Sequence, residues 1–525
     1  MIQVGGKRAH KALLFVLCLG GKRTCSTAFR LQPSLPRRQT AVHHVSRPKA
    51  LSSTATEAVA ESAQGLGTAS GAAGSSRQLQ KAVVVARGKA RLFWDGNPLV
   101  YGGAISRVEG DPIAGDLVDV VDSSGKFIAW GKSVYNPDSM YRVRILARDG
   151  EATAEARDVG AVVKERLLTA RDARRAIGIP NADTDTYRLV NGEGDRLSGL
   201  VVDVFAGVIG VSSSAVWVEA FRPEIETALA QVFGPDATEV IWRRSDGRLQ
   251  QDGWKGTEKS TAAAEAAAAG AGSDAADTGR ENPGGCGSEE AGEGEGGKGE
   301  ERRLRSDAPT TVVRELGLDY LVRPQFGQKT AGFYCDQRES RAAVRELSAG
   351  KNVLDMFCYS GGFALNAAAG GAVRVVAVDS SQPALDDAEI NAARNNLEGL
   401  TEFVKDDALK FMKTAQANGD KYEVVIVDPP KLAPNKKALP RATSRYKRLN
   451  AAALELVAPG GILVTFTCSA AMTQGGGFVG VVQSAAAAAG RTITLLKTVG
   501  PAADHVTNPC YPEGAYLTGA FFYVV

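Results

Sequence analysis

The stretch NVLDMFCYSGGFALNAAAGGAVRVVAVD, residues 352–379, decides the fold class of this chain. An apolar run at 352–357 is followed by a glycine-containing turn, a helix-forming segment and a second apolar run at 374–379. This is the order of a βαβ unit. Four more apolar runs follow, at 401–407, 422–430, 460–469 and 519–525, with helix-forming segments such as 382–396 and 444–457 between them. The alternation predicts an α/β fold with a Rossmann-like, doubly wound sheet over residues 333–525.

Two further domains are predicted upstream of this sheet. Residues 79–152 alternate short apolar runs with Gly, Asn and Pro, and carry a turn signal at Ser123-Ser124-Gly125, which predicts a small β domain. Residues 153–332 combine a helix pattern at 153–174 with strand-and-turn segments, which predicts a central α+β domain. The acidic, Gly/Ala-rich stretch 251–307 cannot bury enough apolar surface to offset its ordering entropy, so a disordered insertion is predicted there.

The first 78 residues have the composition of a targeting presequence. Ten Lys or Arg residues precede the first acidic residue, Glu57. A basic stretch and a short apolar run, 12–20, come before a small-residue segment with Phe29, an arrangement that resembles the two-part presequences of algal complex plastids. A plastid location is therefore expected, with a mitochondrion as the alternative.

Composition excludes several classes of protein. The 525-residue chain has seven cysteines without C-x-x-C spacing and four scattered histidines, so neither a disulfide scaffold nor a metal site is predicted. No run of eighteen apolar residues occurs, so no membrane partner is expected.

Aspartates stand at the ends of four successive predicted strands, at Asp355, Asp379, Asp407 and Asp428. Ligands of doubly wound sheets bind at the carboxyl ends of the strands. Four carboxylates suit a cationic, diol-bearing nucleoside without phosphates, which predicts S-adenosylmethionine as cofactor, with Asp379 on the ribose and Asp407 on the adenine amino group. Each aspartate could alternatively cap a helix. Ser360-Gly361-Gly362 permits close backbone approach, and the missing G-x-G-x-x-G spacing argues against an NAD-dependent oxidoreductase.

The motifs FGQKTAGFYCDQRESR (326–341), YRLVNGEGDRLSGLVVD (187–203), DPPKLAPNK (428–436), TFTCSAAMT (465–473) and ADHVTNPCYPEGAYLTG (503–519) resemble those of the bacterial RlmI family of large-subunit rRNA cytosine-5 methyltransferases. The resemblance runs from about residue 83 to 525 apart from the insertion. It implies an N-terminal PUA domain, a central α+β domain and a C-terminal class I methyltransferase domain, and homodimers are frequent in the family. It also implies cofactor contacts from Gln337, Arg338, Asp355, Phe357, Gly361, Asp379, Asp407 and Asp428. The predicted cofactor set further includes Tyr359 and Ser380.

Methylation of cytosine C5 requires a thiol. C5 is a weak nucleophile until a cysteine thiolate adds to C6, and the base must be flipped out of any helix. Cys468 follows the strand next to the Asp-Pro-Pro strand, which predicts Cys468 as the nucleophile and Asp428 as the partner of N3. Without the resemblance, a strand-terminal cysteine such as Cys468 would more often be a core residue.

The base that removes the C5 proton is not identified by the sequence. Many RNA cytosine-5 methyltransferases have a second cysteine after the two prolines, where this chain has Lys431. Asp504-His505 is a candidate, with an exposed loop histidine as the alternative.

Basic residues next to the Asp-Pro-Pro motif are candidates for RNA phosphate contacts. The predicted set is Lys431, Lys436, Lys437, Arg445 and Lys447, with Arg441, Arg448 and Tyr446 in the same segment. A solvated helix face would give the same pattern. In the small β domain, Arg107, Lys132, Arg142 and Arg144 are further candidates.

The predicted function is an S-adenosylmethionine-dependent methyltransferase that forms 5-methylcytidine in the large-subunit rRNA of an organelle through a Cys–C6 adduct. Two alternatives remain. One is an RNA guanine or adenine N-methyltransferase in which Cys468 is inert. The other is a non-catalytic RNA-binding assembly factor.

Overall fold

The computed structural model describes residues 81–148, 151, 158–237, 239–254, 310–324 and 332–525. The predicted presequence and residues 255–307 of the predicted insertion lie outside the described residues. Residues 251–254, which the sequence placed in the insertion, are ordered instead, because Asp252 is buried in an ion pair with Arg144.

The N-terminal described region is a six-stranded sheet, which agrees with the predicted small β domain. Its order is β2-β6-β5-β4-β1-β3. The strands are β1 (Ala82–Val85), β2 (Leu99–Tyr101), β3 (Ile105–Glu109), β4 (Leu117–Val121), β5 (Phe127–Tyr135) and β6 (Tyr141–Ile145), with the short helix α1 (Ala90–Trp94). Valines that alternate along these strands meet Phe93 and Ile128 in one core, because successive side chains of a strand point to opposite faces.

The central region has the expected α+β composition. A four-stranded sheet has the order β10-β9-β8-β7. It consists of β7 (Thr186–Asn191), β8 (Leu200–Phe205), β9 (Val208–Ser213) and β10 (Glu239–Arg244), with α2 (Val159–Ala176), α3 (Val216–Ala220), α4 (Arg222–Phe233) and α5 (Asp246–Gln251). The hairpin β11 (Thr311–Glu315) and β12 (Leu318–Val322) follows the undescribed insertion.

The C-terminal region is the doubly wound sheet that the sequence predicts. Its order is β15-β14-β13-β16-β17-β19-β18, parallel except for β19, which runs antiparallel to both neighbours. The strands are β13 (Asn352–Met356), β14 (Arg374–Asp379), β15 (Thr401–Lys405), β16 (Tyr422–Val427), β17 (Val457–Thr467), β18 (Ile493–Val499) and β19 (Thr518–Val524). The chain reverses its strand order between β13 and β16, which is the topological switch point of such a sheet.

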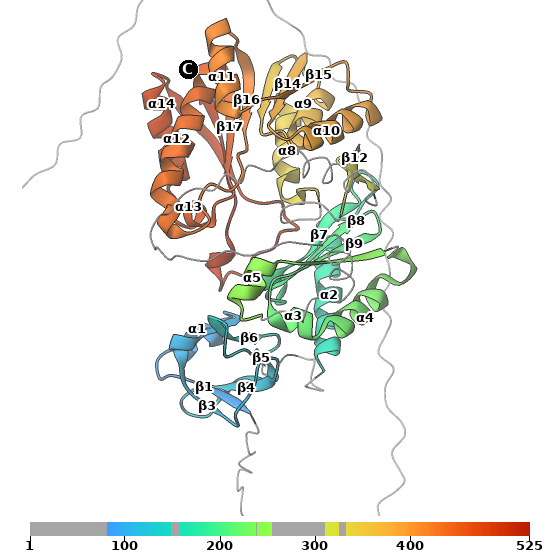
Figure 1. Cartoon of the computed structure of the whole chain (residues 1–525), viewed down its shortest axis with the longest axis vertical. Coiled ribbons are helices and arrows are strands. Elements are labelled where there is room, and N and C mark those ends of the chain that lie inside the picture. The colour runs from blue at the N-terminus through green and yellow to red at the C-terminus, as the bar shows by residue number, and fades with distance from the viewer. Residues whose placement is uncertain (1–80, 149–150, 152–157, 238, 255–309, 325–331) are drawn as a thin grey trace, which may run out of the picture. The chain divides into compact units, whose positions relative to one another are not determined.

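Helices cover both faces of this sheet (Figure 1). One face packs against α11 (Ala408–Asn418), α12 (Leu439–Leu456) and α14 (Phe478–Ala488), and the other against α8 (Arg338–Leu347), α9 (Gly362–Ala369) and α10 (Gln382–Arg394). Neighbouring residues of one strand go to different cores: Leu354 packs on the first face and Val353 on the second. Strands buried on both faces therefore read as continuous apolar runs.

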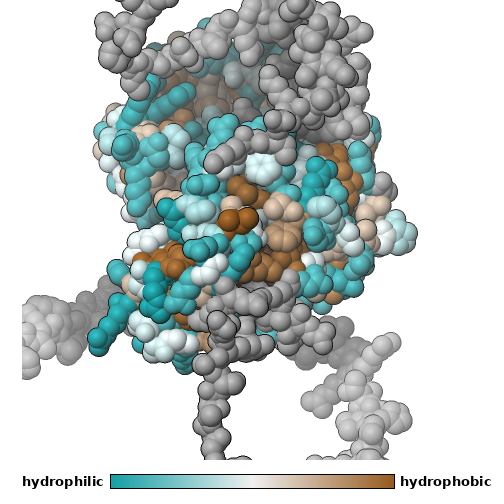
Figure 2. Space-filling view, turned by 60° about the horizontal axis from the view of Figure 1, so that its bottom comes forward, coloured by the Kyte–Doolittle hydropathy of each residue, from teal (hydrophilic) through white to brown (hydrophobic). Residues whose placement is uncertain are grey.

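The outer surface combines hydrophilic and hydrophobic residues. Figure 2 shows a mostly hydrophilic face with hydrophobic residues gathered near its centre. Within the described ranges, no helix has the length and apolar character needed to cross a bilayer.

Candidate active site

The switch point of the sheet brings two of the predicted aspartates together. Asp355 lies in β13, opposite Ile426 of β16, and Asp428 directly follows β16. The backbone N–H of Asp428 donates to the carbonyl of Met356 at 3.4 Å. Both carboxyl groups thus lie at the carboxyl edge of neighbouring strands.

The loop between β13 and α9 has an unusual backbone. Phe357, Tyr359 and Gly361 have φ values of 68°, 51° and 85°. Left-handed conformations at non-glycine residues cost energy and concentrate at functional sites. The loop is held from β14: the carbonyl of Val378 accepts from Phe357 N at 2.9 Å, and the Asp379 carboxylate accepts from Tyr359 N at 3.0 Å. The backbone of this loop is therefore fixed beside both carboxylates.

Asp355 is fully buried, and only one of its two carboxyl oxygens has a hydrogen-bond partner among the described residues. Its Oδ2 accepts from Ala364 N at 3.0 Å, near the start of α9. Its Oδ1 is buried without a hydrogen-bond partner among the described residues. Burial, and then the charge of Asp428, raises the pKa of Asp355 to about 8. Such an acceptor suits a ligand that brings a positive charge or an N–H donor.

Asp428 is half-buried and contacts Gln337, which lies just before α8. The Gln337 amide Nε2 donates to Asp428 Oδ2 at 3.1 Å, while Gln337 Oε1 has no described partner. Burial, and then the charge of Asp336, raises the pKa of Asp428 to about 7. Near neutral pH this carboxyl group can therefore both donate and accept a proton.

The other two strand-end aspartates have different surroundings. Asp379 accepts backbone N–H bonds from Tyr359 and from Ser381, and Ser380 beside it is exposed. Asp407 is exposed, and its Oδ1 caps α11 by accepting from Leu409 N and Lys410 N, both at 3.0 Å. Asp407 thus has the helix-capping role that the sequence left open, and its contact with adenine stays a prediction.

These groups fit S-adenosylmethionine. Two buried acceptors without a described partner, Asp355 Oδ1 and Gln337 Oε1, lie on residues beside the left-handed loop. The pKa values of Asp355 and Asp428 are raised in the ligand-free protein. A cationic ligand would lower both pKa values, because a positive charge favours the ionised carboxyl group. Asp379 retains lone pairs for a ribose diol.

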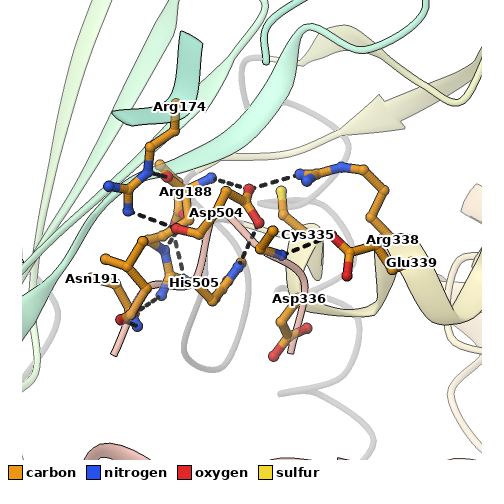
Figure 3. Close-up of polar contacts among 12 residues, drawn as sticks. Arg174, Arg188, Asn191, Cys335, Asp336, Arg338, Glu339, Asp504 and His505 are labelled. Carbon is orange, nitrogen blue, oxygen red and sulfur yellow. Dashed lines mark hydrogen bonds and ion pairs between the residues drawn. The ribbon is translucent and has the colours of Figure 1, made fainter. Parts of the chain in front are cut away.

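Arg338 does not point into this site. Its guanidinium donates to Asp504 Oδ2 at 2.8 Å (Figure 3). It also donates to the Thr186 carbonyl at 3.0 Å and lies 3.5 Å from Glu315. The predicted contact of Arg338 with the cofactor is thus not supported by its geometry: the side chain joins the central region to the C-terminal segment. Buried carboxylates such as Asp504 and Glu315 need a counter-charge close by, and Arg338 supplies one to both.

For Asp504-His505, the alternative of an exposed loop histidine is wrong, whereas the role of a base stays a prediction. His505 is buried rather than exposed, and its Nδ1 bonds Asp504 Oδ1 at 3.0 Å. Asp504 also accepts from Arg188 N at 2.9 Å, and its carbonyl accepts from Arg174 at 2.6 Å (Figure 3). Burial opposes ionisation of Asp504, but His505 and Arg338 hold its pKa well below the ordinary value. The pair belongs to a buried charge cluster, and no contact among the described residues identifies it as a catalytic base.

Cys468, the predicted nucleophile, lies close to the loop after β16. It directly follows β17 and is half-buried, and its Sγ lies 3.9 Å from the carbonyl oxygen of Pro429, the residue after Asp428. Burial, and then the charge of Tyr359, raises the pKa of Tyr334. The Cys468 thiol thus lies beside the loop that carries Asp428.

The other described cysteines have other environments. Cys335 and Cys358 are buried, and burial raises the pKa of both thiols. Cys510 donates through its Sγ to the Asp95 carbonyl at 2.8 Å. Among the described residues, no group of three or more His, Cys, Asp or Glu could hold a metal ion.

The basic segment after the Asp-Pro-Pro motif is largely exposed. Its exposed members are Lys436, Lys437, Arg441, Arg445, Lys447 and Arg448, around the start of α12, while Lys431 is half-buried. Within the part of the chain that the structure describes, these six cations form no ion pair. They remain candidates for phosphate contacts.

Three of the RNA candidates outside the predicted set have other surroundings. Tyr446 is fully buried and cannot contact RNA phosphates. Arg144 is buried against Asp252 and Ser198, and Arg107 pairs with Glu109 at 2.7 Å. The Lys132 side chain is not among the described ones, and Arg142 is half-buried.

Sequence reasoning missed a set of hydroxyl groups around Cys468. Thr467 Oγ1 donates to the Tyr446 hydroxyl at 2.8 Å, and Ser469 Oγ lies 3.0 Å from the same oxygen. All three side chains are fully buried. The sequence feature that could have predicted this network is a hydroxyl residue on each side of the cysteine at the end of a strand.

The chain is similar to known proteins over most of its length. Residues 308–494 match the model of an S-adenosylmethionine-dependent methyltransferase family, and residues 83–148 match a PUA-like domain. Ribosomal RNA large subunit methyltransferase I of Escherichia coli K12 is 33% identical over 440 residues, which cover 83% of this chain and 98% of that protein. The protein of the same name from Shigella flexneri has the same identity and coverage.

Solved structures share the fold. A proposed methyltransferase in complex with SAH covers 84% of this chain and 99% of its own, with a TM-score of 0.63 and 19% identity. A proposed S-adenosylmethionine-dependent methyltransferase from Streptococcus mutans gives a TM-score of 0.61 at 18% identity, with the same coverage. The arrangement of a PUA-like domain followed by a methyltransferase sheet is therefore confirmed.

Proposed function

The chain belongs to the family of S-adenosylmethionine-dependent methyltransferases that includes ribosomal RNA large subunit methyltransferase I, and on this premise we propose that it forms 5-methylcytidine in large-subunit ribosomal RNA. The observation that carries the proposal is the placement of Cys468 Sγ 3.9 Å from the Pro429 carbonyl, next to Asp428. A thiol beside a carboxyl group at the cofactor edge is what the covalent route to cytosine C5 needs.

The reaction begins at the target base. The Cys468 thiolate adds to C6 of a flipped-out cytosine, and the ring electrons move toward N3. Asp428, with a pKa of about 7, stabilises this charge by donating a proton or a hydrogen bond to N3. C5 is then nucleophilic.

Completion of the reaction restores the free enzyme. S-adenosylmethionine, when bound, supplies the electrophilic methyl group. A base then takes the proton from C5, the C5–H electrons re-form the C5–C6 double bond, and the C6–S bond breaks to release the Cys468 thiolate. Any proton that N3 took from Asp428 returns to Asp428 as the cytosine ring is restored. Asp355 and Gln337 are proposed to hold the cationic part of the cofactor, and Asp379 its ribose.

RNA binding is proposed for the exposed cations around the start of α12. Lys436, Lys437, Arg445 and Lys447, together with half-buried Lys431, follow the loop that carries Asp428. Phosphate contacts at this position would orient the strand without reading its sequence.

The test uses methyl-labelled cofactor and large-subunit rRNA transcripts, followed by nucleoside analysis. Wild-type chain is expected to yield 5-methylcytidine, and Cys468→Ala and Cys468→Ser to yield only background. Methylated guanosine or adenosine that persists in both variants would support N-methylation instead. Cofactor binding without a methylated product would support a non-catalytic assembly factor.

A plastid location is proposed from the composition of residues 1–78, with a mitochondrion as the alternative. A fluorescent protein fused behind residue 78 and expressed in an algal cell is expected to co-localise with chlorophyll. Co-localisation with a mitochondrial dye would overturn the plastid proposal.

A further inference from the structure

We infer that the hydroxyl group of Tyr446 is a positioning group for the methyl transfer: it fixes Cys468 against the loop that carries Asp428. The inference rests on the proposed role of Cys468 as nucleophile. Tyr446 lies on α12, does not reach the reacting atoms and acts through its neighbours.

The strand side of the contact is a pair of hydroxyl residues. Thr467 and Ser469 stand on either side of Cys468 in the chain. Thr467 Oγ1 donates to the Tyr446 hydroxyl at 2.8 Å, and Ser469 Oγ lies 3.0 Å from it. The Ser469 backbone N–H also donates to Thr467 Oγ1 at 3.2 Å. One phenol oxygen thus holds both neighbours of the thiol.

The network of hydrogen bonds also includes the loop that follows Asp428. Ala433 N donates to Ser469 Oγ at 3.0 Å, and Ser469 Oγ in turn contacts the Tyr446 hydroxyl. Ala433 follows the Asp-Pro-Pro motif, whose Pro429 carbonyl lies 3.9 Å from Cys468 Sγ. Tyr446 therefore links the segment of the nucleophile to the segment of Asp428.

The phenol has no acid–base part in this arrangement. Burial raises the pKa of Tyr446 above its ordinary value, so the group stays neutral at physiological pH. Its ring packs edge-on against Phe478 at 5.6 Å between centroids. Replacement by phenylalanine would retain that packing and remove only the hydroxyl group.

Loss of the hydroxyl should act on the rate and spare cofactor binding. The cofactor groups stand on β13, β14 and the segment before α8, whereas the Tyr446 hydroxyl bonds Thr467 and Ser469 at the Cys468 strand end. A shift of about 1 Å between reacting groups costs on the order of 100-fold in rate. We expect Tyr446→Phe to lower kcat and the rate of adduct formation about 10- to 100-fold.

The experiment measures three quantities for wild type and variants. They are kcat and KM for rRNA, the Kd for S-adenosylhomocysteine, and the single-turnover rate of adduct formation on RNA that contains 5-fluorocytidine. The matched control is Tyr422→Phe, which removes a buried phenol at the amino end of β16. Thr467→Val removes another hydroxyl group of the network and provides a second test if Tyr446→Phe unfolds.

The outcomes separate the inference from the proposed function. Slow adduct formation in Tyr446→Phe and in Thr467→Val, with unchanged Kd and a normal Tyr422→Phe, supports the inference. Because Tyr446 and Ser469 share one network, the double variant Tyr446→Phe/Ser469→Ala should lose less than the product of the single effects. Wild-type adduct formation that neither hydroxyl variant slows would overturn the inference, whereas the absence of any wild-type adduct or 5-methylcytidine would overturn the proposed function itself.

Discussion

Asp355 is protonated in the folded, ligand-free protein over much of the accessible pH range. Its folded pKa is about 8, raised by burial and by Asp428, whereas the unfolded chain has the ordinary value near 4. A raised carboxyl pKa adds stability that is complete below the unfolded value and is lost as pH rises toward the folded value.

The corresponding prediction concerns Asp355→Asn. As pH rises from 5 to 7, the ionisation preference of Asp355 should lower the free energy of unfolding of the wild type by about 3 kcal/mol. The Asp355→Asn variant should not show this loss. Urea unfolding of the ligand-free protein at the two pH values measures it. Asp420→Asn, at an exposed carboxylate, is the control. An Asp355→Asn variant with the wild-type pH slope would show that Asp355 is ionised when folded.

At the residue scale, the sequence placed four aspartates correctly at strand ends but could not tell their surroundings apart. Apolar periodicity fixes where a buried strand ends, so Asp355, Asp379 and Asp428 were predictable. In contrast, the sequence could not predict which way a side chain points when its neighbours on a helix are charged. Tyr446 stands among exposed cations in the chain, yet it faces the core and bonds both neighbours of Cys468.

At the element scale, the loop from β13 to α9 combines tight backbone geometry with the cofactor site. Gly361 has a φ of 85°, and an added Cβ would lie 3.4 Å from both Ala388 and Leu365. We predict that Gly361→Ala destabilises the protein by about 1 kcal/mol or more and weakens S-adenosylhomocysteine binding at least tenfold, because the loop must shift. Isothermal titration calorimetry measures the affinity.

Gly419→Ala is a matched control for this loop. Gly419 has a φ of 79° at the end of α11, with open space around the added Cβ. It should carry a similar backbone cost and leave the affinity unchanged. Equal loss of affinity in both variants would mean that global destabilisation, and not the loop, controls binding.

The elements themselves were largely predictable, with one clear exception. The segments 382–396 and 444–457 were expected as helices and contain α10 and most of α12. The strand β18 was not predicted. It lies at the edge of the sheet and most of its residues are exposed, so it lacks the apolar run that marks the buried strands.

At the scale of the whole molecule, the Asp504 cluster joins segments more than 300 residues apart. Asp504 contacts Arg174 of α2, the backbone of Arg188 in β7 and the side chain of Arg338. Removing one partner of a buried ion pair leaves an uncompensated charge. We predict that Asp504→Asn lowers the free energy of unfolding by about 3 kcal/mol, measured by urea denaturation at pH 7.

The pH profile provides a check on Asp504. A lowered carboxyl pKa adds stability that is present above the unfolded value near 4 and is lost below it. The effect of Asp504→Asn should therefore shrink as pH falls below about 4. A cost below about 0.5 kcal/mol at pH 7, similar to that of an exposed aspartate, would contradict the assignment.

Contacts of this range could not be read from local patterns. The sequence left Asp504-His505 open between a base and an exposed loop histidine, and Arg338 was a cofactor contact only by family resemblance. Only the packed fold shows that both residues also contact the central region, Asp504 through Arg174 and Arg188 and Arg338 through Thr186. Charge pairing between distant segments has no periodic signature in the sequence.

The central claim is that Cys468 forms a covalent bond with the target cytosine. The most direct measurement is mass spectrometry of protein trapped on rRNA that contains 5-fluorocytidine, in which fluorine replaces the C5 proton that must leave. We predict a nucleotide attached to the peptide that contains Cys468, and no trapped species with Cys468→Ala. Wild-type chain that makes 5-methylcytidine without an adduct at Cys468, or a Cys468→Ala variant with undiminished product, would contradict the claim.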